Sequence, residues 1–395
     1  MQAVANGRGA RRGSTEGRYK KSLSNPDEPL ALALLLALRV HPSSPSRLGG
    51  EARWLGRKPT IQIHMKLPAL QKLTGVAMAT LLGSATTWGI ELNPTLDLTG
   101  YIVGSARYVD QEGNSTLGDD GSKIFWDLDA TKVLASIKTA PVSGTVSFYA
   151  AGTDDVTILD AYFTYDAGGG TTISAGKFLS WHGYEAFDIP NLLQITYSNE
   201  NQETIIPGYH RGIKVDYVQG GSKMGIALLD SVYDSDGEID EGFGLEAYYV
   251  YSADELTAYL GLAYDSSDSD DGEGETGTDK SALANVWVQY VAGSMTYAGE
   301  VAYRSTNPEF SSDVDSYFVS GLAQFALNEK SWIVLRACWG TDDYDSGGSD
   351  DFLKGTVAAR QKISDNFTVV EEISYTTFDI AESRTFLGVQ GRFTF

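Results

Sequence analysis

The stretch TFLGVQGRFTF, residues 385–395, alternates two kinds of side chain over its whole length. The first kind is apolar, aromatic or glycine, at Leu387, Val389, Gly391, Phe393 and Phe395. The intervening positions, such as Gln390, Arg392 and Thr394, are polar or small. A period of two residues is typical of a β-strand whose two faces meet different surroundings. The sequence therefore predicts an amphipathic strand that ends on an aromatic residue.

The same alternation recurs upstream. We expect about sixteen such segments, most of them 9–15 residues long, beginning near residue 90. A tilted membrane-spanning strand needs about 9–11 residues, so these lengths suit a bilayer crossing. The expected segments are 95–109, 123–139, 143–151, 156–166, 171–179, 208–218, 222–232, 242–252, 255–265, 281–291, 294–304, 314–327, 330–340, 352–363, 366–378 and 384–395.

The connections between these segments alternate between short and long. The short ones are turns rich in Gly, Asn, Asp, Ser or Pro, of the kind that close hairpins. The longer ones are mostly acidic, at 110–122, 180–207, 233–241, 266–280, 305–313 and 341–351. Transmembrane β-barrels are built in this way, with short turns on the periplasmic side and longer loops outside.

These patterns predict an all-β fold, a transmembrane antiparallel up-and-down β-barrel of about sixteen strands. No run of about 18 apolar residues is present, which argues against a bundle of membrane-spanning helices. Only helices and closed barrels satisfy their backbone groups in lipid. A barrel of this size would enclose an aqueous lumen. The rival interpretation is a soluble all-β domain, which would partition into water without detergent.

The charge of the chain is unevenly distributed. The formal net charge is −22, yet the first 64 residues carry 11 Lys and Arg against 4 Asp and Glu. The remaining residues are therefore strongly acidic, which excludes nucleic acid as a partner because phosphate binding needs a positive surface. Cys338 is the one cysteine of the chain, so no intrachain disulfide forms.

The first 89 residues are predicted to precede the barrel. Residues 1–64 are rich in Arg, Ser and Pro without periodicity, and we expect a disordered upstream extension. Residues 65–89 match a secretory signal peptide, with Lys66 and Lys72 before the apolar run 73–82 and small residues after it. An alternative places the apolar core of the signal at 30–38. The barrel domain is then 90–395.

The region 90–395 resembles a bacterial outer-membrane porin of the OmpL-like β-barrel family. The resemblance lies in GKFLSWHGYEAFDIP at 176–190, followed by HRGIKVDY at 210–217. The departures are Trp181 and His182 at the loop entry and the acidic outer loops. The resemblance implies a passive channel for small hydrophilic solutes in the bacterial outer membrane, with no cofactor. It also implies contact with outer-membrane lipids, recognition of Phe393 and Phe395 by the barrel-assembly machinery, and a homotrimer as one arrangement.

The longest connection, 180–207, contains apolar residues that a solvated loop does not need, and the resemblance implies that it folds into the lumen. Opposed rings of charge at such a narrow point select ions. We expect acids on this loop to face bases on the barrel wall across a constriction. The expected acids are Glu185, Asp188, Glu200 and Glu203, and the expected bases are Arg107, Lys177, Lys214, Arg336, Lys354, Arg360 and Arg392.

Three further points remain open from the sequence. The acidic outer loops predict a mild cation preference, but they also admit a different function, an adhesin or Ca²⁺-binding anchor. They lack the spacing of an EF-hand, and no metal site is predicted. An enzyme is not expected; the alternative is an outer-face Ser–His pair that uses His210. Glu371 and Glu372 are adjacent, so one of them must face outward, and the pattern does not decide which.

Overall fold

The computed structural model describes residues 89–112, 121–185, 187–202, 204–233, 242–270, 276–378 and 382–395. The extension and the signal peptide predicted at 1–64 and 65–89 lie outside the described residues, apart from Gly89. The strands are β1 Ile90–Asn93, β2 Leu96–Glu112, β3 Gly121–Lys138, β4 Val142–Ala151, β5 Thr157–Gly168, β6 Thr171–Leu179, β7 Tyr209–Gln219, β8 Ser222–Leu229, β9 Gly242–Ala253, β10 Leu256–Asp270, β11 Thr276–Ala292, β12 Met295–Asn307, β13 Val314–Asn328, β14 Ser331–Tyr344, β15 Ser349–Lys362, β16 Phe367–Phe378 and β17 Glu382–Thr394.

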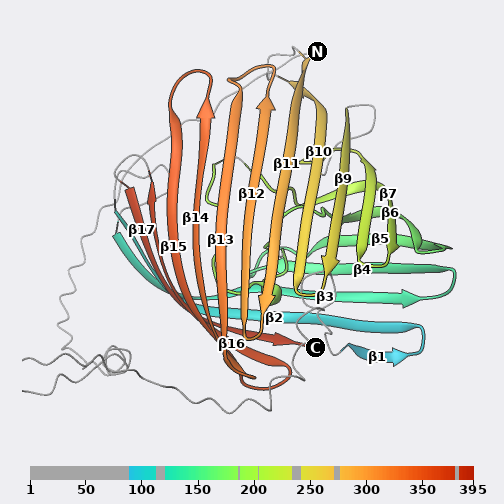
Figure 1. Ribbon diagram of the computed structural model, residues 1–395, viewed down its shortest axis with the longest axis horizontal. Helices are drawn as coiled ribbons and strands as arrows, with labels where there is room; N and C mark the ends of the chain where they lie inside the picture. Colours follow the sequence, from blue (N-terminus) through green and yellow to red (C-terminus); the bar gives the residue numbers. More distant parts are fainter. Residues whose placement is uncertain are drawn as a thin grey trace, which may run out of the picture. The chain divides into compact units, whose positions relative to one another are not determined.

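The strands form one closed antiparallel barrel. Each strand from β2 to β17 pairs with its neighbours in the chain, and β17 pairs back onto β2, so sixteen strands close the ring. The short β1 adds a hairpin to the start of β2. In Figure 1 the long strands β10–β15 stand side by side, while β2–β5 run across them. The predicted sixteen-stranded barrel is confirmed.

The two faces of each strand differ as the alternation predicts. On β15, Leu353 and Val357 point outward and are 57% and 47% exposed, whereas Lys354 and Thr356 point inward and are 1% and 4% exposed. Hydrophobic residues on the outside and polar ones inside are what a water-filled barrel in lipid requires. No helix among the described residues is long and apolar enough to cross a bilayer.

Several strands run further into the predicted loops than expected. β10 and β11 pair without interruption from Leu256 and Tyr290 up to Asp270 and Thr276. The region expected as an acidic loop at 266–280 is therefore largely a continuing hairpin. Asp and Ser have a low propensity for strands. The hydrogen bonds between the two strands continue past them nonetheless, since their side chains stay in water on an outer hairpin.

The ring closes where the last residues of the chain meet the first long strand. The backbone N–H of Gly100 donates to the carbonyl of Phe395 at 2.8 Å, and the N–H of Phe395 donates back at 3.0 Å. A Cβ at position 100 would lie 2.3 Å from the backbone carbonyl oxygen of Lys132 and 2.6 Å from the Phe395 ring. Only glycine therefore admits the terminal aromatic ring at this seam.

Candidate pore constriction

The connection between β6 and β7 folds into the lumen and packs on the inner wall. Its residue Ile205 is fully buried in a cluster with Phe178 of β6 and Phe318 of β13. Ile195 packs in a second cluster with Val334 of β14 and Val370 of β16. The apolar residues of the connection 180–207 thus explain why it lies inside the barrel, as predicted, instead of projecting into water.

The first part of the loop is held by polar side chains of β9 and β12. The hydroxyl of Ser180 donates to Glu246 at 2.7 Å. The backbone N–H of Tyr184 donates to Glu300 at 2.9 Å, and the same carboxylate oxygen accepts from Asn285 at 2.8 Å. Backbone groups of a non-helical segment at membrane depth must find such partners within the protein.

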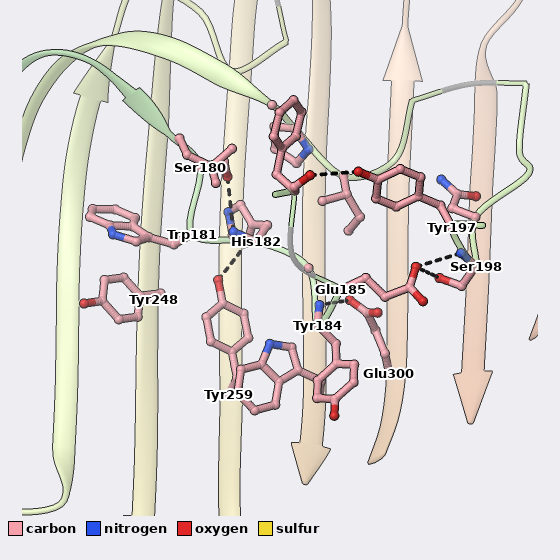
Figure 2. A pocket seen from close by; sticks show the side chains of 18 of the residues that line it. Ser180, Trp181, His182, Tyr184, Glu185, Tyr197, Ser198, Tyr248, Tyr259 and Glu300 are labelled. Atoms are coloured by element: carbon pink, nitrogen blue, oxygen red, sulfur yellow. Dashed lines mark hydrogen bonds between the residues drawn. The ribbon is translucent and has the colours of Figure 1, made fainter. Parts of the chain in front are cut away.

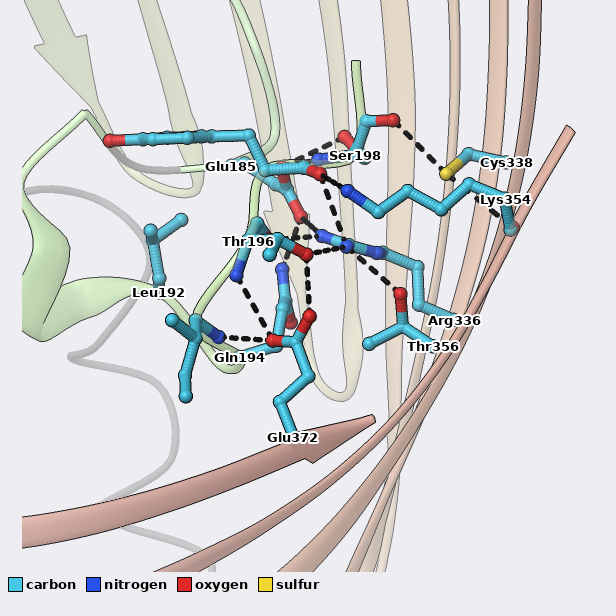
Figure 3. Close-up of polar contacts among 12 residues, drawn as sticks. Glu185, Leu192, Gln194, Thr196, Ser198, Arg336, Cys338, Lys354, Thr356 and Glu372 are labelled. Atoms are coloured by element: carbon cyan, nitrogen blue, oxygen red, sulfur yellow. Dashed lines mark hydrogen bonds and ion pairs between the residues drawn. The ribbon is translucent and has the colours of Figure 1, made fainter. Parts of the chain in front are cut away.

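The middle of the loop is clamped against β14 and β16 (Figure 3). Arg336 forms an ion pair with Glu185 at 2.5 Å and donates to the carbonyl of Thr196 at 2.8 Å. Glu372 accepts from the backbone N–H groups of Ile195 and Thr196, at 2.5 and 3.0 Å. The open choice between the two adjacent glutamates is settled, because Glu372 faces inward and Glu371 is exposed on the outer face.

Glu200 fixes the following part of the loop to β15 and β17. Its carboxylate lies 2.6 Å from the ammonium of Lys354 and also pairs with Arg384. Burial by itself raises the pKa of Glu200, but Lys354 and Arg384 outweigh that effect and hold the pKa below its usual range. The carboxylate is therefore charged throughout the neutral range.

Asp188 reaches β2 and β3, which lie across the lumen from the β9–β12 wall that holds the first part of the loop. It lies 3.1 Å from Lys132 on β3 and accepts from the hydroxyl of Tyr101 on β2 at 3.0 Å. Next to it along the chain, the carbonyls of Leu192 and Gln194 each accept from Arg392 on β17 at 2.5 Å. The loop consequently crosses the lumen and is attached at both sides.

The remaining predicted residues fall in different places. Arg107 faces inward and pairs with Asp129, which sits at the bulge between β2 and β3. Arg360 faces inward beside Trp332, 5.9 Å from its ring centroid. Lys214 also faces inward but makes no ion pair with any described residue. Glu203 lies outside the described residues.

The inward orientation predicted for Lys177 is wrong. In the ladder Lys177 pairs with Ala161 and Arg211, while its neighbour Phe178 pairs with the buried His210. Successive side chains of a strand point to opposite faces, so the burial of Phe178 and His210 places Lys177 on the outside. Lys177 is two residues from the end of β6, where a long side chain can reach the membrane surface.

Sequence reasoning missed several residues that hold the loop. Lys132 and Glu246 each lie on an inner face, and so do Glu300 and Glu372, which hold backbone N–H groups of the loop. Their signal was present, because each is a charged residue on the polar side of an alternating segment. The charge pattern predicts only pairs of loop acids with wall bases, whereas the wall also uses carboxylates that accept hydrogen bonds from the loop backbone.

Two histidines and a glutamate are buried together near the loop entry. The Nε2 atoms of His182 and His210 lie 3.8 and 3.7 Å from the two carboxylate oxygens of Glu246. The hydroxyl of Tyr259 is 3.0 Å from Nδ1 of His182. Burial lowers the pKa of His182 to about 3, so its imidazole is neutral. The enzyme alternative fails at this point, because His210 is buried inside the barrel and cannot act on the outer face.

A cavity of about 1000 Å³ remains beside the loop, next to β7–β9. Figure 2 shows Trp181 of the loop above Tyr248, and Tyr259 below His182. The rings of Tyr248, Tyr259 and Trp287 stack in sequence along three neighbouring strands, with centroids 6.2 and 5.2 Å apart. This side of the loop is thus lined by aromatic rings, in contrast to the ion pairs on the other side.

The fold has close structural relatives among bacterial outer-membrane proteins. OmpT of Vibrio cholerae, as a loop L8 deletion mutant, has a TM-score of 0.58 at 13% identity, covering 76% of this chain and 99% of that one. An anion-selective porin from Comamonas acidovorans has a TM-score of 0.57 at 11% identity, with coverages of 76% and 99%. The outer membrane channel DcaP of Acinetobacter baumannii has a TM-score of 0.56 at 13% identity, covering 78% of this chain and 99% of that one.

A closed sixteen-stranded barrel with a polar inner face and an internal loop defines an outer-membrane porin. The model of the family described as "Putative beta-barrel porin-2, OmpL-like" matches residues 136–393. The chain therefore belongs to this porin family, as the sequence indicated, and is a channel protein of the bacterial outer membrane and not an enzyme. No curated protein matches it.

Proposed function

We propose that this porin lets small hydrophilic solutes and ions diffuse passively across the outer membrane, with a mild preference for cations. The proposal rests on one observation: the inner wall is polar, and a loop that is fixed on both sides of the lumen leaves a cavity of about 1000 Å³ beside it. Glu185, Asp188 and Glu200, together with Arg336, Lys354 and Arg392, form the constriction in this proposal.

The cation preference comes from the mouth of the channel. The loop carboxylates Glu185, Asp188 and Glu200 are each in contact with a base on the wall, so their charges largely cancel locally. The outer ends of β14 and β15 carry Asp343, Asp345, Asp350 and Asp351, and the stretch 343–351 contains no Lys or Arg. A negative mouth repels anions over roughly one Debye length, about 8 Å at physiological salt.

A reversal-potential measurement in a planar bilayer tests this proposal. Under a KCl gradient we expect K⁺ to permeate better than Cl⁻, and the preference to fade as salt is raised toward 1 M, where the Debye length is about 3 Å. Equal permeability at low salt would contradict the cation preference. Liposome swelling with uncharged sugars of increasing size would give the size limit, and no swelling would contradict passive diffusion.

The adhesin or Ca²⁺-anchor alternative rests on the same acidic outer segments. Among the described residues, no group of three or more His, Cys, Asp or Glu has the geometry to hold a metal ion. Deleting an outer hairpin tip separates the two functions, since a channel keeps its conductance and an adhesin loses its partner. A homotrimer, as in the trimer form of OmpT of Vibrio cholerae, is proposed as the assembly and is testable by cross-linking in detergent.

A further inference from the structure

Lys214 on β7 differs from the other basic residues of the inner wall. Its ammonium lies 4.3 Å from the ring centroid of Phe178, 5.3 Å from that of Trp181 and 5.6 Å from that of Tyr162. In the described part of the chain, no side-chain hydrogen bond or ion pair reaches this ammonium. The rings stabilise the cation through their π faces, and among the described residues they are its only close side-chain contacts.

The carboxylates nearest to Lys214 already serve other groups. Asp216 accepts from the hydroxyl of Tyr248 at 2.8 Å, and Glu246 accepts from Ser180. Asp160 lies 3.2 Å from the ammonium of Lys132. Lys214 is thus a half-buried cation that forms no ion pair with a described residue, and it lines the cavity beside the loop.

The cavity adds a flat apolar surface next to this cation. Trp181 and Tyr248 line it and are half-buried, with ring centroids 4.6 Å apart. Its volume of about 1000 Å³ admits a small organic molecule. The only other lysine among the described lining residues is Lys223, which has no ring over its ammonium.

We propose that Lys214 and the rings around it form a binding site for small aromatic monocarboxylates on their way through the channel. The carboxylate accepts charge-assisted hydrogen bonds from the ammonium, and the ring of the solute packs against Trp181 and Tyr248. The inference rests on the proposed channel function and deepens it by naming a solute class. A phosphate fits less well, because it needs several donors and one ammonium surrounded by hydrocarbon supplies few.

Single-channel recording with three probes tests the site. Benzoate carries both the ring and the charge, benzamide lacks the charge, and acetate lacks the ring. We expect benzoate to reduce the KCl current in a saturable way, at concentrations about tenfold lower than either of the other two. Lys214→Met keeps an unbranched apolar side chain and removes the charge. It should raise the half-blocking concentration of benzoate by about tenfold and leave the half-blocking concentration of benzamide unchanged.

The chain offers matched controls. Lys177→Met makes the same substitution on the adjacent strand but on the outer face, and it should leave the benzoate block unaltered. Lys214→Arg keeps the cation and should retain most of the block. Trp181→Leu should weaken the block by benzoate and leave the block by acetate unchanged. It also serves as the second test if Lys214→Met fails to fold.

The outcomes are distinguishable from failure of the channel proposal. A wild-type protein that conducts KCl but responds equally to benzoate and acetate would overturn the site and leave the channel intact. A Lys214→Met channel that is blocked as well as the wild type would overturn it too. A folded protein that conducts nothing would instead overturn the proposed function itself.

Discussion

The internal loop meets two unlike surfaces of the same barrel. Toward β14–β17 it is held by buried ion pairs, such as Glu185 with Arg336 and Glu200 with Lys354. Toward β7–β9 it leaves a cavity lined by aromatic rings and by Lys214, which has no ion pair with any residue that the structure describes. The comparison shows that ion pairs hold the loop on one wall, whereas on the other wall hydrogen bonds to Glu246 and Glu300 hold only its first part and a cavity remains beside it. The following predictions test that division, from the largest expected effect to the smallest.

Arg336→Met should produce the largest change, because it detaches the loop from the ion-paired wall. Removing one partner of a buried pair costs about 3–5 kcal/mol, since the remaining charge is left uncompensated. We expect frequent current fluctuations and a conductance raised by roughly twofold or more as the loop moves. Single-channel recording checks this. A quiet channel of unchanged conductance would show that the pair does not hold the loop.

The adjacent residues Glu371 and Glu372 give a matched comparison within one strand. Glu372→Ala removes the acceptor for two backbone N–H groups of the loop and should destabilise the protein by about 2–3 kcal/mol. Glu371→Ala changes an exposed outer position and should leave stability within about 0.5 kcal/mol. Urea unfolding in lipid vesicles measures both. Equal losses would mean that Glu372 does not anchor the loop.

Acidic pH should weaken the attachment of the loop to β15 and β17 over a defined pH range. The pKa of Glu200 is lowered in the folded state, so its contribution is complete above the ordinary Glu value of 4.5 and is lost as pH falls through the lowered folded value. Current noise should therefore stay constant from pH 7 to about 5 and rise only at more acidic pH. Glu200→Gln should show this noise already at neutral pH. A rise in current noise centred near pH 6 would show that a titrating group other than Glu200 controls the loop.

Tyr248→Phe should have the smallest effect, because it acts on the cavity side. It removes the hydroxyl that donates to Asp216 and leaves that carboxylate free to attract cations. We expect the K⁺-to-Cl⁻ permeability ratio to rise by less than about twofold, with loop noise unchanged. Reversal potentials measure the ratio. An increase in noise would show that the contact between Tyr248 and Asp216 also steadies the loop.

The barrel could be predicted from the sequence because its signal is local and repeated. The alternation in residues 385–395 and in fifteen further segments fixes which side chains face inward, and Arg336, Lys354 and Arg392 do so. Lys177 was misplaced because β6 is short and ends at the loop, where a lysine on the outer face still reaches water.

The contacts of the loop could not be predicted in the same way. Which acid meets which base depends on the path of nearly thirty residues through the lumen, and that path is set by packing of Ile195 and Ile205 into separate clusters. The role of Glu300 and Glu372 as acceptors for backbone N–H groups also needs the path. Periodicity carries no information about such long-range partners.

The seam between Gly100 and Phe395 has a consequence for biogenesis. Because β17 supplies the partner for both β16 and β2, a polypeptide that stops before residue 382 would present two long unpaired edges at once. Exposed edges of this kind recruit other strands and aggregate. The cylinder can therefore be sealed only when β17 is in place between these two edges.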